Sequence, residues 1–327
     1  MVEARVRAVA VTLVTFDSER WIGTCLDALA KQTHLPAEVV VLDNASRDES
    51  AALAAAHPLV SRVLREPVNI GFAAGQNRAI AATVSGWVLV LNPDAFLTTT
   101  FIEQLLLRAE SGGRLGALCG KLRRAADDGS PIEPALLDST GMVVTREFRH
   151  LDRGAGEPDR GQFECEQMVF GASGAAALFS RQMLEDVRIE GEIFDQHFFA
   201  YREDADLAWR AQLLGWDCLY VPGAVGYHVR RVVPERRSEL PAEINRHSVR
   251  NRFLMRIKNA DAAVWRRCGW RGLLRDGLVF VACLVREWSS LPAFAEVVRE
   301  TPRALRWRRA IKARQRRHGA EIAGWFR

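Results

Sequence analysis

Short apolar runs alternate with amphipathic helical patterns through the first 110 residues, and this alternation constrains the fold more than any other feature of the chain. Strands separated by helices predict a parallel sheet with helices on both of its faces. The runs are continuously apolar, as strands are when both faces of their sheet are covered. The expected strands are residues 6–16, 37–44, 61–66 and 87–92, and the expected helices are 18–32, 47–57, 71–84 and 99–110.

The pattern loosens after about residue 115. Polar stretches rich in Gly and Pro are expected as loops at 123–134 and 152–162, and a strand followed by a helix is expected at 170–187. A strong amphipathic helix is expected at 202–216, and a strand, a turn and a His at 217–230. We therefore divide the chain into a first half-domain, 1–115, a second half-domain, 116–255, and a C-terminal helical part, 256–327.

Charge and cysteine content narrow the function classes. The net charge of +5 comes from the end of the chain, because residues 299–327 carry ten Lys or Arg and two Glu. The remaining residues, with 35 basic and 38 acidic side chains, sum to −3, so nucleic-acid binding is disfavoured. Six cysteines without a CxxC pair argue against a zinc site or a disulfide framework and favour a reducing cytoplasm. Asp17, Glu19 and Arg20 directly follow the first apolar run, which favours a strand over a signal peptide.

The C-terminal part contains an unbroken apolar octet, residues 278–285, with charged residues on both sides. A membrane-spanning helix needs about 20 apolar residues. An apolar helix followed by a helix rich in Trp and Arg fits an element that lies in a bilayer surface. The alternative is a helix that packs on the domain and has a solvated basic end.

Acidic side chains follow two of the expected strands. Asp43 ends "VVVLD", and Asp94 follows "VLVLN". Ligands of open parallel sheets bind outside the carboxyl ends of the strands. Asp43 could accept hydrogen bonds from a base or ribose, and Asp94, with Asn92 nearby, could hold a divalent cation that bridges two phosphates. The alternative is that both are turn formers.

A second acidic group opens the helix in "REDADLAWR", where Glu203, Asp204 and Asp206 occupy three of four positions. The helix dipole favours acids there, but one carboxylate could also serve as a general base. Neighbouring residues on a helix point about 100° apart, so we expect one base and one supporting carboxylate. His228 could be a further cation ligand or a diphosphate contact. The stretch 71–77 lacks the GxGxxG pattern, which disfavours a Rossmann dehydrogenase.

Seven motifs in order carry a resemblance to a known family. They are "VTFDSERWIGTCLDAL", "VVVLDNASRDES", "NIGFAAGQNRAI", "VLVLNPDA", "FGASGAAALFSRQ", "FDQHFFAYREDADLAWRAQLLGW" and "YHVR". The chain resembles the inverting family 2 glycosyltransferases over roughly residues 6–255, and looks most like their bacterial rhamnosyltransferase branch. The resemblance implies an α/β GT-A nucleotide-sugar-binding fold, with a mostly parallel central sheet flanked by helices and a C-terminal helical extension.

The resemblance also implies roles for particular residues and a divalent cation, Mg²⁺ or Mn²⁺. Asp204 would be the catalytic base, with Glu203 beside it, and Asp94 and His228 would be at the metal. Gly171, Ala172 and Ser173 would form part of the acceptor site. The nucleotide-sugar would be bound by Phe16, Asp17, Asp43, Asn69, Gly71, Asn77, Asn92 and Asp94.

Two residues depart from the family pattern. Asp17 stands where relatives often carry Asn, and Asn92 stands at the first position of the DxD-like element. One carboxylate fewer at this element would weaken the affinity for the cation.

The activity implied by the resemblance is transfer of a sugar, L-rhamnose from dTDP-rhamnose as the first choice, to a lipid-linked or polysaccharide acceptor in envelope glycan synthesis. UDP-hexose and UDP-galactofuranose donors remain open, as do a sugar-phosphate nucleotidyltransferase and a non-catalytic sugar-nucleotide-binding module. Bacterial relatives often work at the cytoplasmic face of the membrane. We therefore expect a cytoplasmic enzyme, peripheral on the inner face of the plasma membrane and held there by its C-terminal tail. The sequence leaves the oligomeric state open.

Overall fold

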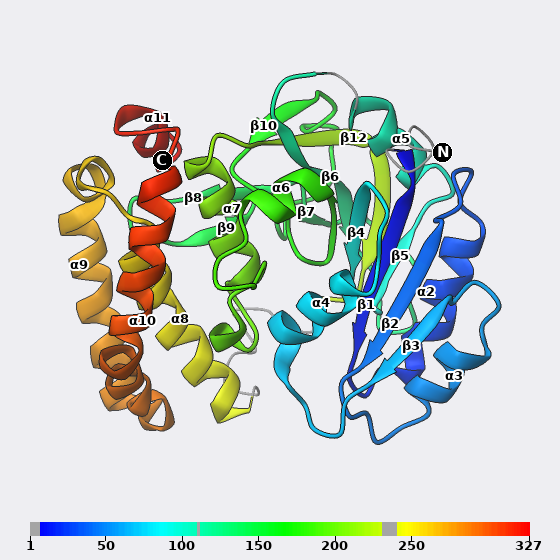
Figure 1. Cartoon of the computed structure of the whole chain (residues 1–327), viewed down its shortest axis with the longest axis horizontal. Coiled ribbons are helices and arrows are strands. Elements are labelled where there is room, and N and C mark those ends of the chain that lie inside the picture. Colours follow the sequence, from blue (N-terminus) through cyan, green and yellow to red (C-terminus); the bar gives the residue numbers. More distant parts are fainter. Residues whose placement is uncertain (1–6, 110–111, 231–240) are drawn as a thin grey trace.

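A mixed sheet forms the framework of the protein. The computed structural model describes residues 7–109, 112–230 and 241–327. Within these residues, ten strands form one sheet in the order β10-β12-β6-β11-β4-β1-β2-β3, with β5 paired to β12 and β7 paired to β6; β8 and β9 form a separate pair (Figure 1). The strands are β1 Val9–Thr15, β2 Glu38–Asp43, β3 Arg62–Arg65, β4 Trp87–Leu91, β5 Ala95–Leu97, β6 Leu115–Arg124, β7 Leu137–Ser139, β8 Met142–Val144, β9 His150–Asp152, β10 Gln167–Val169, β11 Ala176–Ser180 and β12 Asp217–His228.

The first four long strands are parallel, as the sequence predicts. β1 lies between β2 and β4 and runs parallel to both, and β3 runs parallel to β2. β11 is antiparallel to both β4 and β6, and β12 is parallel to β6. Thr15 is in register with Asp43, which is in register with Arg65, so the parallel strands end together at one edge. This large α/β sheet, parallel from β4 through β1 and β2 to β3 and flanked by helices, confirms the predicted fold class.

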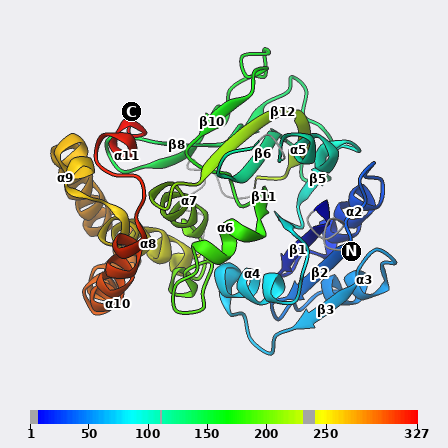
Figure 2. The ribbon, with the colours of Figure 1, turned by 45° about the horizontal axis from the view of Figure 1, so that its top comes forward.

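Helices cover both faces of the sheet, which explains why the strands are apolar throughout (Figures 1 and 2). One face packs against α2 and α5 through residues such as Ile22, Leu26 and Leu105. The other face packs against α4, α6 and α7 through residues such as Ile80 and Leu207. The helices are α2 Glu19–Ala30, α3 Ser50–Ala56, α4 Gly71–Ala81, α5 Phe101–Ala109, α6 Arg181–Asp186 and α7 Glu203–Leu213, with a 3₁₀ turn, η1, at Gln196–Phe198.

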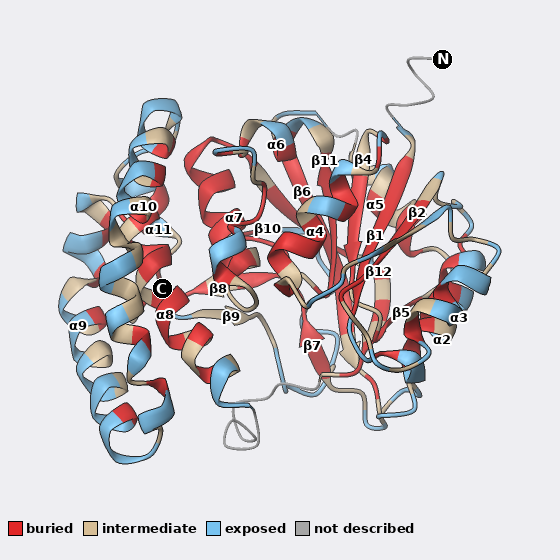
Figure 3. Cartoon of the chain, turned by 60° about the horizontal axis from the view of Figure 1, so that its bottom comes forward, coloured by how far each residue is buried: buried red, intermediate tan, exposed pale blue. Residues whose placement is uncertain are grey.

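The helix α7 is buried on two sides. Leu207 and Ala211 face the sheet, whereas Trp209 and Leu213 belong to a second core that the C-terminal helices complete. Figure 3 shows the strands and α7 as the most buried part of the molecule and α9 as the most exposed helix at its edge. The C-terminal elements are α8 Ala242–Asn259, α9 Ala262–Val285, η3 Trp288–Ser290, α10 Pro292–Arg314 and α11 Ala320–Gly324.

The C-terminal helices are therefore part of the folded body. Trp307 of α10 is completely buried, and its indole N–H donates to Glu190 at 3.1 Å. Three cations lie over or beside its ring, Arg303 at 4.5 Å, Lys258 at 4.9 Å and Arg210 of α7 at 5.5 Å from the ring centroid. The predicted division at residue 256 falls inside α8, which packs on α10, and it stays a prediction.

We expect Trp307→Ala to lower the free energy of unfolding by about 3–5 kcal/mol, because it removes a fully buried indole that joins α10 to α7. Leu305→Ala on the same helix is the control, since Leu305 is exposed, and it should cost less than about 1 kcal/mol. Denaturant unfolding followed by tryptophan fluorescence and circular dichroism measures both. Equal losses in the two variants would contradict the packing described above.

Candidate active site

The two acidic residues predicted at strand ends lie at the edge where the parallel strands finish. Asp43 is the last residue of β2 and is 6 % exposed; its Oδ1 accepts the N–H of Ser46 at 3.3 Å. Asp94 lies in the turn between β4 and β5, and the backbone N–H of Asn92 donates to Ala175 O ahead of β11 at 2.9 Å. The carboxyl ends of β1, β2 and β4 therefore share their edge of the sheet with the residues that precede β11.

Asparagine side chains tie the N-terminus of α4 to this edge. Asn69 Oδ1 accepts hydrogen bonds from Asn44 Nδ2 and from the N–H of Gly71, both at 2.9 Å. Gly71 has a φ of +82°, and a Cβ at this position would lie 2.6 Å from atoms of Phe199. Only glycine fits such a position. Gly71 therefore allows the loop ahead of α7 to sit directly on the start of α4, where Ala73 N–H donates to Phe199 O at 3.1 Å.

The other residues that the resemblance assigned to the nucleotide-sugar differ from one another in their surroundings. Phe16 follows β1 and is 41 % exposed, so its ring is available for stacking. Asp17 has a φ of +49° and accepts the N–H of Arg47 at 2.8 Å, which joins two loops at the strand ends. The side-chain amide of Asn77 forms hydrogen bonds with the backbone of Ile193 and Phe194. We therefore leave Asn77 out of the proposed site.

A line of alternating charges starts at Asp94. Its Oδ1 lies 3.4 Å from Nε2 of His228, which is the last residue of β12. His228 Nδ1 lies 2.8 Å from Oδ2 of Asp138. Asp138 also pairs with Arg230, and Arg230 pairs with Asp152. Motif spacing identified Asp94 and His228, but Asp138 and Asp152 were missed because they lie in very short strands with no distinctive pattern.

His228 and Asp138 each shift the pKa of the other. Burial alone would lower the pKa of His228, but the carboxylates of Asp138 and Asp94 outweigh burial and raise it to about 10. Burial alone would raise the pKa of Asp138, but His228 and Arg230 lower it to about 2. His228 is therefore protonated at neutral pH, and Asp138 holds its ring in a fixed orientation.

Asp204 reaches the same region from the start of α7. Its Oδ2 accepts the N–H of Gly174 at 3.1 Å, and its Oδ1 accepts the N–H of Ala205 at 2.7 Å. Burial raises its pKa, the two N–H groups oppose the rise, and the charge of Asp152 adds to it. Asp204 is thus adjacent both to the segment that pairs with Asn92 and to the end of the charged line from Asp94. The structure brings the predicted Asp94, His228 and Asp204 into one region.

Glu203 differs from Asp204 in accessibility. It is 7 % exposed, and its Oε2 has no hydrogen-bond partner among the described residues. Burial raises its pKa well above the usual range, and the charge of Asp204 adds to this effect. Asp204 is only half-buried. Of the two carboxyl groups, Asp204 is therefore the one that a substrate can reach.

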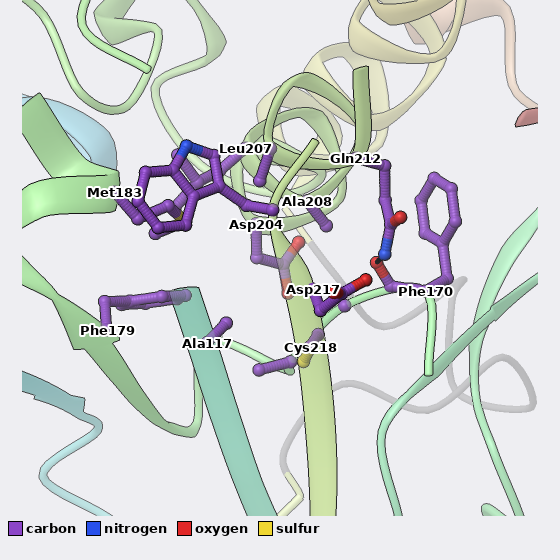
Figure 4. Close-up of a pocket in the computed structure, with 14 residues that line it drawn as sticks. Ala117, Phe170, Phe179, Met183, Asp204, Leu207, Ala208, Gln212, Asp217 and Cys218 are labelled. Atoms are coloured by element: carbon purple, nitrogen blue, oxygen red, sulfur yellow. Dashed lines mark hydrogen bonds between the residues drawn. The ribbon is translucent and has the colours of Figure 1, made fainter. Parts of the chain in front are cut away.

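The residues predicted for the acceptor lie beside α7. Gly171 and Ala172 are buried, and a Cβ on Gly171 would lie 2.3 Å from Ala208 Cβ, so this stretch packs directly under the helix. Both line a small cavity between α7 and the sheet, and Asp204 is also among its lining residues (Figure 4). Ser173 is half-buried and precedes Gly174. This cavity is a gap in the packing, far too small for a sugar.

A strained loop presents Asp204. Phe199, Tyr201 and Arg202 have φ values of 63°, 71° and 72°, which non-glycine residues adopt at a cost of about 1–2 kcal/mol each. The fully buried Asn251 of α8 holds this loop, since its Nδ2 lies within 2.8 Å of Phe198 O, 3.2 Å of Ala200 O and 2.9 Å of Tyr201 O. The sequence analysis missed Asn251, whose only signal is a lone polar residue in a helix.

The side chains at this edge could supply some of the ligands of a divalent cation. Among the described residues, no three His, Cys, Asp or Glu side chains gather as a metal site. Asp94 and His228 do face each other, and His228 has a carboxylate on its other ring nitrogen, as metal-binding histidines usually do. Two protein ligands are enough for a cation that is also held by phosphate oxygens.

We expect Asn251→Ala to loosen the loop ahead of α7, because the carbonyl groups of Phe198, Ala200 and Tyr201 lose the side-chain amide that they share. The free energy of unfolding should fall by about 1–3 kcal/mol. Amide hydrogen exchange should rise at residues 198–206 and stay unchanged in β1, β2 and β4. Exchange that rises equally everywhere, or nowhere, would show that Asn251 does not hold this loop.

Comparisons with known proteins identify relatives of this chain. The chain is 29 % identical over 247 residues to an N-acetylglucosaminyl-diphospho-decaprenol L-rhamnosyltransferase of Mycobacterium tuberculosis, covering 67 % of this chain and 75 % of the relative. It is also 24 % identical over 129 residues to the putative glycosyltransferase EpsH of Bacillus subtilis, covering 38 % of this chain and 37 % of that one.

Solved structures share the fold. S. aureus TarS 1-349 in complex with UDP matches with a TM-score of 0.59 and 16 % identity, over 94 % of this chain and 83 % of that chain. The chain spans 53 % of the longer TarS structure, again with 16 % identity and with a TM-score of 0.58 over 94 % of this chain. The mannosyltransferase PcManGT of Pyrobaculum calidifontis, in complex with GDP-Man and Mn²⁺, matches with a TM-score of 0.51 and 17 % identity, over 94 % and 85 % of the two chains. The family described as glycosyl transferase family 2 matches residues 10–188. The chain is thus a member of glycosyl transferase family 2 with the GT-A fold.

Proposed function

We propose that this glycosyltransferase moves a sugar from a nucleotide-diphospho-sugar to a hydroxyl group of a lipid-linked or polysaccharide acceptor, with inversion at the anomeric carbon. One observation carries the proposal. The half-buried carboxyl group of Asp204 lies at the same edge of the sheet as the Asp94–His228 pair and the end of β2. A transferase of this kind needs a base on one side of the anomeric carbon and positive charge near the diphosphate on the other.

The chain's own residues can carry the proton transfer. The acceptor hydroxyl attacks the anomeric carbon from the face opposite the diphosphate. Asp204 takes the hydroxyl proton as the new bond forms, and the bond from that carbon to the diphosphate oxygen breaks, so that the nucleoside diphosphate leaves. The N–H of Gly174 fixes Oδ2, and the start of α7 favours the charged carboxylate. The pKa of Asp204, raised by burial, makes it a stronger base than an exposed Asp. A positioned base typically contributes about 10²–10⁴-fold to the rate.

Asp94 and His228 would hold Mg²⁺ or Mn²⁺ together with the diphosphate oxygens. The cation, when bound, neutralises the negative charge that grows on the leaving diphosphate. His228 would lose its proton on binding the cation, and Asp138 would keep its ring oriented through Nδ1. Asp43 and Phe16 would contact the base and ribose, and Asn69 with Gly71 would shape the wall between the nucleotide and α4. Ser173, next to the N–H that holds Asp204, would face the acceptor.

The favoured donor is dTDP-rhamnose. Its support is the relative from M. tuberculosis, whose name states an L-rhamnosyl transfer to a lipid-linked acceptor. A UDP-hexose or UDP-galactofuranose would use the same acidic positions and is the alternative. A lipid-linked acceptor would place the enzyme at the inner face of the plasma membrane.

Screening nucleotide sugars for thermal stabilisation, with and without Mn²⁺, identifies the donor, because a bound ligand stabilises the folded state by mass action. With that donor, we expect Asp204→Asn to lower kcat for transfer by at least about 10²-fold while the donor still raises the melting temperature. The reason is that an amide cannot accept the hydroxyl proton.

Glu203→Gln is the matched control, since the amide resembles the protonated Glu203 that burial favours. We expect it to lose less than tenfold in kcat. If Asp204→Asn keeps full transfer in a folded protein, or if Glu203→Gln is the variant that loses it, Asp204 is not the base.

A further inference from the structure

The helix α9 lies at the edge of the molecule (Figure 1), and much of it is exposed (Figure 3). Eight large apolar residues on α9 and directly after it are each more than half exposed. We call this set the α9 face: Trp270, Leu273, Leu274, Leu278, Val281, Leu284, Val285 and Trp288. Soluble proteins rarely expose a contiguous apolar patch of this kind unless it binds something.

These residues form one stripe. They follow one another at intervals of one, three or four positions, which places them on the same side of a helix. The charged side chains between Leu273 and Val285 are only half-exposed. The stripe from Trp270 to Val285 is about 22 Å long at 1.5 Å per residue.

The opposite side of α9 is fixed to the protein. Val264, Cys268 and Cys283 are buried, and a Cβ on Gly272 would lie 2.6 Å from the ring of Phe148. Asp276 accepts hydrogen bonds from Arg252 and Arg256 of α8, at 3.1 and 2.6 Å. The helix therefore cannot turn its apolar face inward without breaking these contacts.

The exposed charges of the C-terminal helices are mostly basic. Among residues 262–327, all of which the structure describes, ten exposed side chains are Lys or Arg and one, Glu321, is acidic. Three of the arginines flank the stripe, Arg266 and Arg267 at one end and Arg286 at the other, and Trp270 and Trp288 lie near its two ends. Tryptophan and arginine at the margins of an apolar stripe suit the boundary between lipid and water.

We propose that the α9 face is a docking surface for an anionic lipid bilayer, with α9 lying parallel to the membrane plane. The apolar side chains enter between the headgroups, and the flanking arginines meet lipid phosphates. Charge complementarity favours an anionic bilayer over a second copy of the chain as the partner of this face. Two α9 faces packed against each other would bring their arginines together. The inference is independent of the sugar and acceptor proposed above.

The sequence suggests a membrane surface made of an apolar helix and the Trp- and Arg-rich helix that follows it; of these two, only α9 has its apolar side exposed. The Trp-bearing basic helix α10 is anchored inside the protein, since Trp307 and Ile311 are buried and Arg303 pairs with Asp195. Within the described residues, no single helix meets the length and hydropathy of a membrane span; Ala262–Val285 and Trp288–Arg314 meet them only together, with a bend of 119°. Deleting the tail would remove part of the core, so point substitutions are the better test.

The test uses the full chain and Leu278→Glu/Val281→Glu, which places two carboxylates in the middle of the α9 face. Flotation is measured with vesicles of phosphatidylcholine and of phosphatidylcholine with 30 % phosphatidylglycerol. Leu35→Glu/Val84→Glu is the matched control, since it makes the same change at two other exposed apolar positions. Unfolding midpoints confirm that the variants are folded.

We expect the wild type to bind the anionic vesicles at least tenfold more tightly than the neutral ones, and more weakly as salt rises. The α9 double variant should bind the anionic vesicles at least tenfold more weakly, and the control should match the wild type. Equal binding by both double variants, or no binding by the wild type, overturns the proposal. So does a wild-type dimer in light scattering that becomes a monomer in the α9 variant, because the face is then a self-association surface.

Discussion

The buried carboxylate of Asp206 fixes the position of α7, and the proposed chemistry depends on that helix. Asp206 is completely buried and is held by Arg210 at 3.0 Å, Lys258 at 2.9 Å and Asn259 at 2.8 Å. An unpaired carboxylate at such a depth would cost several kcal/mol. Any slide or rotation of α7 would break these pairs, and Asp204 lies only two residues away.

The same network makes the C-terminal helices part of the site. Lys258 also pairs with Asp195, which Arg303 of α10 pairs with in turn. Asn251 of α8 holds the strained loop that leads into α7, and that loop contacts the start of α4 through Phe199. The donor edge of the sheet, the base and the C-terminal helices are therefore mechanically connected. One consequence is that α9, the helix proposed to dock on a membrane, packs on the same framework that positions Asp204.

The sequence predicts the parts of the fold that have a strong period. Strands β1, β2 and β4 and helices α2, α4 and α7 lie within a few residues of their expected bounds, because each is long and has a clear apolar pattern. The three-residue strands β5 and β7 to β10 were missed, since three residues cannot show a period. β12 runs unbroken through the turn expected within 217–230, with a register shift at Val221–Val225. α8 was missed because its buried residues include arginines, lysine and asparagines that only the folded network can pair.

The acidic residues of the candidate site could be predicted from the sequence. The proximity of Asp43 and Asp94 could also be predicted, because parallel strands end at one edge of the sheet. The supporting residues of the site could not be predicted, since Asp138, Asp152 and Asn251 acquire meaning only from partners distant in the chain. The central claim is that Asp94, His228 and Asp204 surround one donor site. The most direct measurement is anomalous X-ray diffraction from crystals grown with Mn²⁺ and the donor's nucleoside diphosphate. We expect a manganese peak at coordination distance from Asp94 and His228, with the diphosphate on the side that faces Asp204. A peak elsewhere, or a diphosphate with α7 turned away from it, would show that these three residues do not surround one donor site.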